Sequence, residues 1–192
     1  RGMACKGPAL FSVFTGTEQP ATHLPPYLLA AAAMQSRAFP AFCYDAQAGD
    51  NWAQRFSLEN NPAPEDDWSV ETLDYSDDAL QRASATVAFT YPDYVFCDSR
   101  HASHFALVPR GRWGDDMMPV ADWLVLPNAE TSQRVPYLWV VDGNDVLQRV
   151  IVDARLMQAT RRCLLLWHRL QEHGGVHDSH AERLLAKEKA AW

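Results

Sequence analysis

The chain has 192 residues, of which 47% are hydrophobic and 21% are charged. This is enough apolar side chain to close the core of one domain, or of one and a half, and it excludes a disordered, collagen-like or coiled-coil protein. The 17 basic and 24 acidic residues leave a formal net charge of -7. That charge argues against a general binder of nucleic acid or of anionic membranes, since both need a surplus of Lys and Arg.

Residues 7–14 form the first predicted element, a nearly continuous apolar run that begins with Gly-Pro and is followed by Thr-Gly-Thr. Such a run predicts a strand that is buried on both faces, as in a parallel sheet. The sequence begins at Arg1, and Met3 stands too close to the apolar run to head a signal peptide. At the other end, Trp192 closes a helical pattern that no glycine cap follows. We therefore interpret the chain as a piece of a longer polypeptide.

A helix is predicted over residues 27–37, where leucine, alanine and methionine are good helix formers. Pro25 and Pro26 open this helix, and Pro40 ends it. A second short apolar run follows at residues 39–44. Strand, polar loop, helix and second apolar run together predict a βαβ unit.

Residues 45–78 are predicted to form a long ordered loop, because glycine, asparagine and proline break any periodicity there. Trp52, Phe56 and Trp68 are the expected anchors of this loop. Its second part, residues 59–78, carries eight carboxylates and no Lys or Arg. We favour a solvated acidic surface over a partner-binding role for these carboxylates.

The middle third gives weaker patterns. Moderate alternation predicts a strand at residues 85–90, and a short helix is expected within residues 91–105. Residues 110–126 are rich in aromatic side chains, and Trp113 and Trp123 are the expected core anchors there.

A β-hairpin is the clearest local prediction. Residues 135–141 and 146–152 are β-branched runs, and the turn between them contains Gly143 and Asn144, which accept the positive φ that tight turns demand. The first of the two strands is apolar throughout, so we expect it to be central in its sheet.

Two helices are predicted to follow the hairpin. Asp153 can cap the first, whose apolar residues recur at three- and four-residue spacing until Gly174 and Gly175 end it. Ser179 and Glu182 have the spacing of a capping box, which predicts a second helix at the end of the chain.

Motifs that carry chemistry are sparse. The four cysteines are scattered with no CxxC pair, so they cannot build a local zinc or iron–sulfur loop. Two histidine pairs, at 101/104 and 177/180, have helical spacing, but surface or capping roles are favoured over a metal site that needs three or four ligands. No GxSxG motif is present, and Cys43 lacks a local base.

The best candidate site is the loop after the first predicted strand, at Thr15, Gly16 and Thr17. Ligands of α/β proteins bind at the carboxyl ends of parallel strands, and the start of the helix after Pro25 is expected nearby. Every parallel strand has such an end, so the pattern is not specific.

Four stretches resemble a known family: residues 7–10 with their apolar strand, the helix at 30–37, the run Phe-Pro-Ala-Phe-Cys-Tyr-Asp at 39–45, and residues 55–62. They are similar to the C-terminal end of the thiamine pyrophosphate domain of pyruvate:ferredoxin (flavodoxin) oxidoreductases. The remainder resembles the extension of long, fused members. Motif-level similarity covers about the first third of the chain.

The sequence departs from the family at two cofactor motifs. The cysteine that completes the proximal iron–sulfur cluster is replaced around Gly16 and Thr17. The Gly-Asp-Gly…Asn motif for diphosphate and magnesium would lie before Arg1. The resemblance therefore implies thiamine pyrophosphate, magnesium and iron–sulfur clusters in the parent enzyme, with Thr15, Gly16 and Thr17 near the cofactor there, and none of these cofactors in the isolated fragment.

The resemblance implies an α/β fold: the end of a parallel-sheet thiamine-binding domain at residues 1–62, an acidic loop and irregular α+β segment at 63–134, and an extension with the β-hairpin and terminal helices at 135–192. The implied partners are the rest of the parent polypeptide, ferredoxin or flavodoxin, and a second copy in a homodimer, with neither nucleic acid nor membrane. A cytoplasmic location is implied.

Two functions follow from these observations. In the first, the chain completes the thiamine domain of an enzyme that oxidatively decarboxylates pyruvate or a similar 2-oxoacid, and the isolated fragment is inactive. The alternative is a non-catalytic α+β interaction module that docks neighbouring domains or subunits. The lack of a complete local motif favours the interaction module for the fragment alone. The pattern at residues 7–45 favours the 2-oxoacid-oxidising enzyme for the parent.

Overall fold

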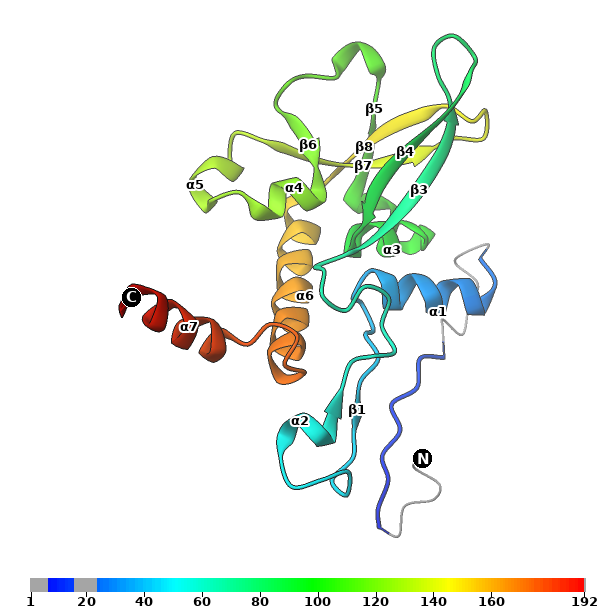
Figure 1. Ribbon diagram of the computed structural model, residues 1–192. Coiled ribbons are helices and arrows are strands. Elements are labelled where there is room, and N and C mark those ends of the chain that lie inside the picture. Colours follow the sequence, from blue (N-terminus) through cyan, green and yellow to red (C-terminus); the bar gives the residue numbers. More distant parts are fainter. Residues whose placement is uncertain (1–6, 16–23, 192) are drawn as a thin grey trace.

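The computed structural model describes residues 7–15 and 24–191 (Figure 1). It is a mixed α/β arrangement of small sheets and several helices. The long helix α6 (Ala154–His173) runs from the sheets to the loops at the other end of the molecule. Both hydrophobic clusters of the protein include residues of this helix, so α6 joins the two ends.

The largest sheet has four strands in the order β5-β8-β7-β6. The bounds are Phe105–Val108 for β5, Met117–Pro119 for β6, Val135–Val141 for β7 and Leu147–Val152 for β8. The pairs β5/β8 and β7/β8 are antiparallel, and β6/β7 is parallel. The predicted hairpin is confirmed, and β7 is an interior strand as expected.

The turn of this hairpin differs in detail from its prediction. Asp145, and neither Gly143 nor Asn144, adopts the positive φ, at 58°. The Asp142 carboxylate accepts hydrogen bonds from the backbone N–H groups of Asn144 and Val146, at 2.8 and 3.1 Å. This side-chain bridge fixes the turn and brings the left-handed residue to position 145.

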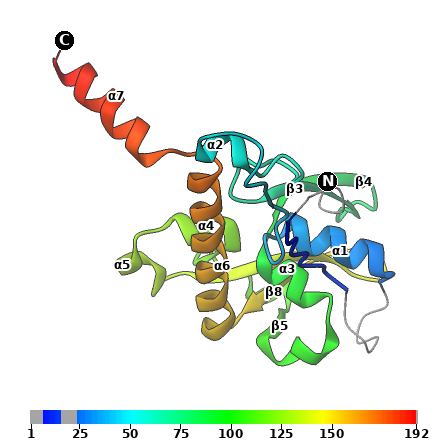
Figure 2. The same cartoon turned by 90° about the horizontal axis from the view of Figure 1, so that it is seen from below.

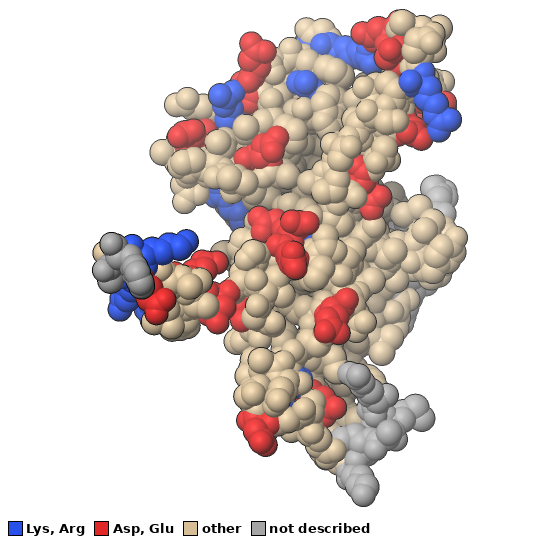
Figure 3. All heavy atoms as spheres, in the orientation of Figure 1, with Lys and Arg blue, Asp and Glu red and all other residues tan. Residues whose placement is uncertain are grey.

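A second hairpin joins β3 (Ser69–Ser76) to β4 (Arg82–Phe89). The sequence predicted a strand at 85–90, and β4 begins earlier. Its partner β3 lies in the stretch that was predicted to be loop, so that part of the loop prediction is wrong. The acidic side chains of residues 59–78 are spread over the loop and β3, and acidic residues form separate spots on the face shown in Figure 3.

Helix α6 begins and ends as predicted. The Asp153 carboxylate accepts a hydrogen bond from the Leu156 N–H at 2.7 Å, and Gly174 is the C-cap. One core lies between α6 and the large sheet. Its buried members are Val95, Val120, Leu138, Val152, Leu156 and Met157. A second, smaller core holds Phe56, Leu58 and Trp167, the last only 1% exposed.

The N-terminal part contradicts the predicted βαβ unit. Residues 7–15 are extended without forming a strand, and Leu10 is 97% exposed. The predicted helix is confirmed as α1 (Pro26–Gln35). The run after it gives only β1 (Cys43–Tyr44), which pairs antiparallel with β2 (Phe56–Ser57) beyond the short helix α2 (Trp52–Arg55). The parallel sheet fails here because residues 7–15 pair with no neighbouring strand among the described residues.

The remaining elements are short. The predicted helix within 91–105 is split into α3 (Tyr91–Phe96) and a 3₁₀ helix (Ser99–His104). A 3₁₀ turn (Arg110–Arg112), α4 (Val120–Val125) and α5 (Asn128–Thr131) surround the large sheet. The expected core anchors Trp113 and Trp123 are both half-buried, and Trp123 packs against the core between α6 and the large sheet.

The chain ends in α7 (Ser179–Ala191), as predicted, but its cap is different. The Asp178 carboxylate accepts hydrogen bonds from the N–H groups of His180 and Ala181, at 2.9 and 3.2 Å. Ser179 instead donates its hydroxyl to Glu172. Among the helices that the structure describes, none combines the length and the apolar character needed to span a membrane.

Candidate functional site

The site expected at the first loop is only partly described. Thr15 is exposed at the end of the extended N-terminal segment. Gly16 and Thr17 lie outside the described residues. The proximity of these three residues to a cofactor stays a prediction.

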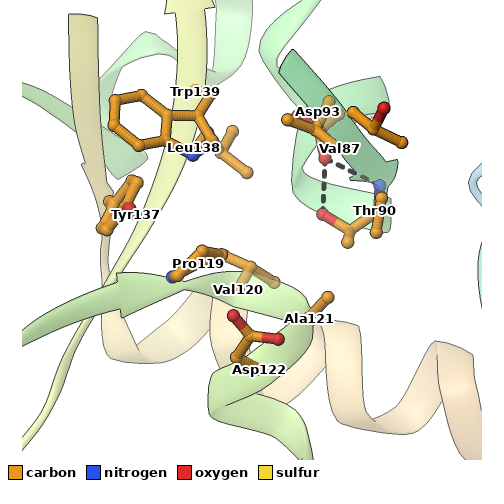
Figure 4. A pocket seen from close by; sticks show the side chains of 12 residues that line it. Val87, Thr90, Asp93, Pro119, Val120, Ala121, Asp122, Tyr137, Leu138 and Trp139 are labelled. Carbon is orange, nitrogen blue, oxygen red and sulfur yellow. Dashed lines mark hydrogen bonds between the residues drawn. The ribbon is translucent and has the colours of Figure 1, made fainter. Parts of the chain in front are cut away.

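A pocket of about 170 Å³ lies between the two hairpins (Figure 4). Four segments form it: the end of β4, the start of α3, the start of α4 and the middle of β7. Two carboxyl groups line it, Asp93 from α3 and Asp122 from α4. We call this cavity the Asp93 pocket.

Asp93 is held by a capping box at the start of α3. Its Oδ2 accepts hydrogen bonds from the backbone N–H of Thr90 at 2.7 Å and from the Thr90 hydroxyl at 2.6 Å. Burial raises the pKa of Asp93 to about 6, although the hydrogen bonds from Thr90 oppose the shift. A carboxyl group with this pKa can take up and release a proton close to neutral pH.

The opposite wall of the pocket is aromatic. Tyr137 and Trp139 line it, with ring centroids 4.9 Å apart in an edge-to-face arrangement. Arg149 on β8 lies over the rings of Tyr137, Trp139 and Trp113, at 4.5, 4.9 and 4.5 Å from their centroids. Burial raises the pKa of Tyr137, and the Arg149 charge opposes that change. The cation–π cluster fixes this wall.

The Asp93 pocket therefore combines a carboxyl group whose pKa is raised to about 6 with an aromatic wall. Its volume is similar to that of a cavity that admits a ligand the size of benzene. The capping of α3 already explains why Thr90 and Asp93 face each other. The signal for that cap, Thr-x-x-Asp, is present in the sequence. The pocket itself was not predicted, because its walls come from four separate segments.

A larger and more open groove, of about 580 Å³, runs along α6. We call it the α6 groove. Its floor includes Leu166, Trp167 and Leu170, and Pro40 closes one side. The side chains of Arg162 and Arg169 line it as well, and both residues are exposed. The groove is thus apolar within and basic at its edge.

Cys163 lies in the same groove but is poorly suited to act as a nucleophile. Its Sγ donates to the backbone carbonyl oxygen of Arg37 at 3.2 Å. Burial raises the pKa of the Cys163 thiol to about 12, despite the nearby Arg37 charge. The thiolate form is therefore rare at neutral pH.

The two histidine pairs have separate structural partners. His104 Nδ1 lies 2.8 Å from the Asp153 carboxylate at the start of α6, and His177 Nε2 lies 2.8 Å from the Glu65 carbonyl oxygen. His180 contacts Arg183. In the part of the chain that the structure describes, no three His, Cys, Asp or Glu side chains are grouped so as to hold a metal ion.

Comparison of the sequence with models of protein families and with curated proteins, and of the structure with solved structures, finds no match.

Proposed function

We propose that this chain completes the thiamine-binding domain of an enzyme that oxidatively decarboxylates pyruvate or a similar 2-oxoacid and passes the electrons to ferredoxin or flavodoxin. In this proposal residues 7–14 form a strand of a parallel sheet whose other strands belong to the rest of the parent polypeptide. The proposal rests on the sequence resemblance at residues 7–62 and on one structural observation, the exposure of the apolar N-terminal segment.

That segment exposes large apolar side chains in a row. Leu10, Phe11 and Val13 are 97%, 62% and 70% exposed. Covering each of them would contribute about 1.5–3 kcal/mol. The end of the segment is not far from the body, because the ring of Phe14 lies 5.6 Å from that of Phe39. The segment therefore suits a strand that lacks its neighbours.

In this proposal the rest of the parent polypeptide binds the cofactors. The described residues do not supply the grouped thiolates of an iron–sulfur cluster, because no three His, Cys, Asp or Glu side chains are grouped among them. Thiamine pyrophosphate would supply the carbanion chemistry of the decarboxylation. The contribution of this chain is to close the sheet that supports the cofactor.

The test is an anaerobic assay of the complete polypeptide, with coenzyme A and pyruvate, 2-oxoglutarate or a branched 2-oxoacid as substrate and methyl viologen as the electron acceptor. We expect reduction of the dye with one of these substrates. Leu10→Asp should lower the rate by about tenfold or more, because a carboxylate would enter the buried strand. Leu80→Asp is the matched control, since Leu80 is 84% exposed at the tip of the β3–β4 turn. Absence of reduction with all three substrates would overturn the proposal.

The alternative, a non-catalytic module that docks a neighbour, is favoured by a different observation. Helix α7 projects from the molecule with Leu184 and Leu185 exposed (Figures 1 and 2). A module of this kind would bind its partner through α7 without any 2-oxoacid-dependent reduction. The assay above separates the two functions.

A further inference from the structure

Helix α7 packs little against the rest of its own molecule. Each of its residues from Ser179 to Ala190 is exposed, and in both views the helix extends away from everything else (Figures 1 and 2). An isolated helix of this length, 13 residues, is only marginally stable in water. A surface that covers one face of α7 would therefore stabilise it.

Hydrogen bonds hold the segment between α6 and α7 against the rest of the molecule. The Trp52 indole N–H donates to the His173 carbonyl oxygen at 2.7 Å, and the Val176 N–H donates to the Gln171 carbonyl oxygen at 3.0 Å. His177 lies against the Glu65 carbonyl oxygen, at 2.8 Å. These contacts hold the connection between α6 and α7, and α7 extends outward from it (Figures 1 and 2).

One face of α7 has a distinct chemistry. Ala181, Leu184, Leu185 and Glu188 recur at three- and four-residue spacing and so share a face. Glu188 follows the two leucines by four and three residues, which places a carboxylate at the end of an apolar strip. Among the described residues it has no ion-pair partner.

The α6 groove has the complementary chemistry. Leu166 lines it and is 58% exposed. Arg162 precedes Leu166 by four residues and Arg169 follows it by three, so both arginines lie along the same side of the leucine, one turn before it and one turn after it. Neither arginine is ion-paired within the described residues. An apolar floor with two unpaired cations along one edge matches a helix that carries two leucines beside one unpaired carboxylate.

We propose that α7 of one copy docks in the α6 groove of a second copy of this chain, with Leu184 and Leu185 on the apolar floor and Glu188 paired with the arginines at its edge. The exchange is reciprocal, so two such contacts close a dimer. Of the basic residues of α7, Arg183 and Lys187 lie off the face that carries the leucines, and Lys189, which follows Leu185 by four residues, lies at its edge. This interface goes beyond the proposed function and does not depend on thiamine chemistry.

The test is sedimentation velocity of the full 192-residue chain over concentrations from about 1 to 200 µM. We expect a monomer–dimer equilibrium in this range. Glu188→Arg should weaken the dimer by about tenfold or more, and so should Arg162→Glu combined with Arg169→Glu. The three substitutions together should restore the dimer to within about threefold of the original affinity. Lys187→Glu, off the leucine face of α7, is the matched control and should change little.

Circular dichroism and urea unfolding of each variant check that the fold is intact. A chain that stays monomeric throughout the range would overturn the proposal. So would a dimer that is unaffected by the reversal at Glu188, or one that the combined reversal fails to restore. A dimer that forms through the exposed residues 7–14 would be unaffected by the Glu188 reversal. The experiment therefore distinguishes such a dimer from docking of α7.

Discussion

The guanidinium carbon of Arg37 lies 4.2 Å from the centroid of the Trp167 ring, which joins the end of α1 to the middle of α6. The same guanidinium donates hydrogen bonds to the backbone carbonyl oxygens of Pro62, Ala63, Asp66 and Asp67, at 2.8 to 3.3 Å. Arg37 adopts a φ of 61°, a conformation in which glycine is usual after a helix. The contacts of its side chain explain why a large residue occupies this position.

Removal of the Arg37 guanidinium should destabilise the protein strongly. Arg37→Met would remove the side-chain donor of the Pro62, Ala63 and Asp67 carbonyl oxygens, whereas the Asp66 oxygen keeps its hydrogen bond from the Trp167 indole N–H. We expect a loss of about 3–5 kcal/mol in the free energy of unfolding. Arg37→Lys should recover less than half of it, because a single ammonium cannot reach four acceptors. Urea unfolding followed by tryptophan fluorescence measures both. Arg112→Met is the control, because Arg112 is exposed and lies outside the α6 groove, and its expected change is within about 0.5 kcal/mol.

Asp93 should make stability depend on pH. The pKa of Asp93 is about 6 in the folded protein and lies above its ordinary value of 3.8. The contribution of protonated Asp93 to the free energy of unfolding is therefore fully present below pH 3.8 and is lost as pH rises through 6. Between about pH 4 and pH 7.5 the loss amounts to at most about 3 kcal/mol. Asp93→Asn cannot ionise and should abolish this component.

The measurement is the difference in unfolding free energy between Asp93→Asn and the original chain at each pH. That difference should move in favour of the asparagine variant as pH rises, while other titrating groups cancel. A difference that stays constant from pH 4 to 7.5 would show that Asp93 does not titrate in this range.

Substitution by alanine should lower the free energy of unfolding more at Trp167 than at Trp139. Trp167 is 1% exposed, so Trp167→Ala should cost about 3–5 kcal/mol. Trp139 is only half-buried, and its ring packs edge-to-face on Tyr137 and Trp113. Trp139→Ala should therefore cost less, about 1–3 kcal/mol. Equal losses in urea unfolding would contradict this ranking.

Limited digestion of the chain with thermolysin should cut first within residues 9–14, where exposed leucine, phenylalanine and valine are accessible. Helix α1 should survive much longer, because Leu29, Ala32 and Ala33 are buried. Mass spectrometry of early time points identifies the cuts. Cleavage inside α1 or the β7–β8 hairpin at the same rate would contradict the exposure of the N-terminal segment.

Local signals predicted the elements whose determinants are local. The β7–β8 hairpin, α1 and α6 follow from β-branched runs, good helix formers and caps such as Asp153 and Gly174. The β3–β4 hairpin was missed because its turn holds no glycine or asparagine. Leu80 takes the positive φ there, at 59°, and the Asp77 carboxylate bridges the turn by accepting from the N–H groups of Ala79 and Gln81.

Tertiary features lay beyond the reach of sequence patterns. The walls of the Asp93 pocket come from β4, α3, α4 and β7, so no single window contains the site. The contact of Arg37 with Trp167 joins residues that are far apart in the chain. The apolar run at residues 7–14 was predicted as a buried strand, but composition cannot show whether neighbouring strands are present to pair with it.

The central claim is that residues 7–14 form a buried strand once the rest of the parent polypeptide is present. Hydrogen–deuterium exchange of the amides in this segment tests it most directly, in the 192-residue chain and in the complete polypeptide. We predict rapid exchange in the chain alone, because the segment pairs with no strand among the described residues, and strong protection in the complete polypeptide. Equally rapid exchange in both would contradict the claim.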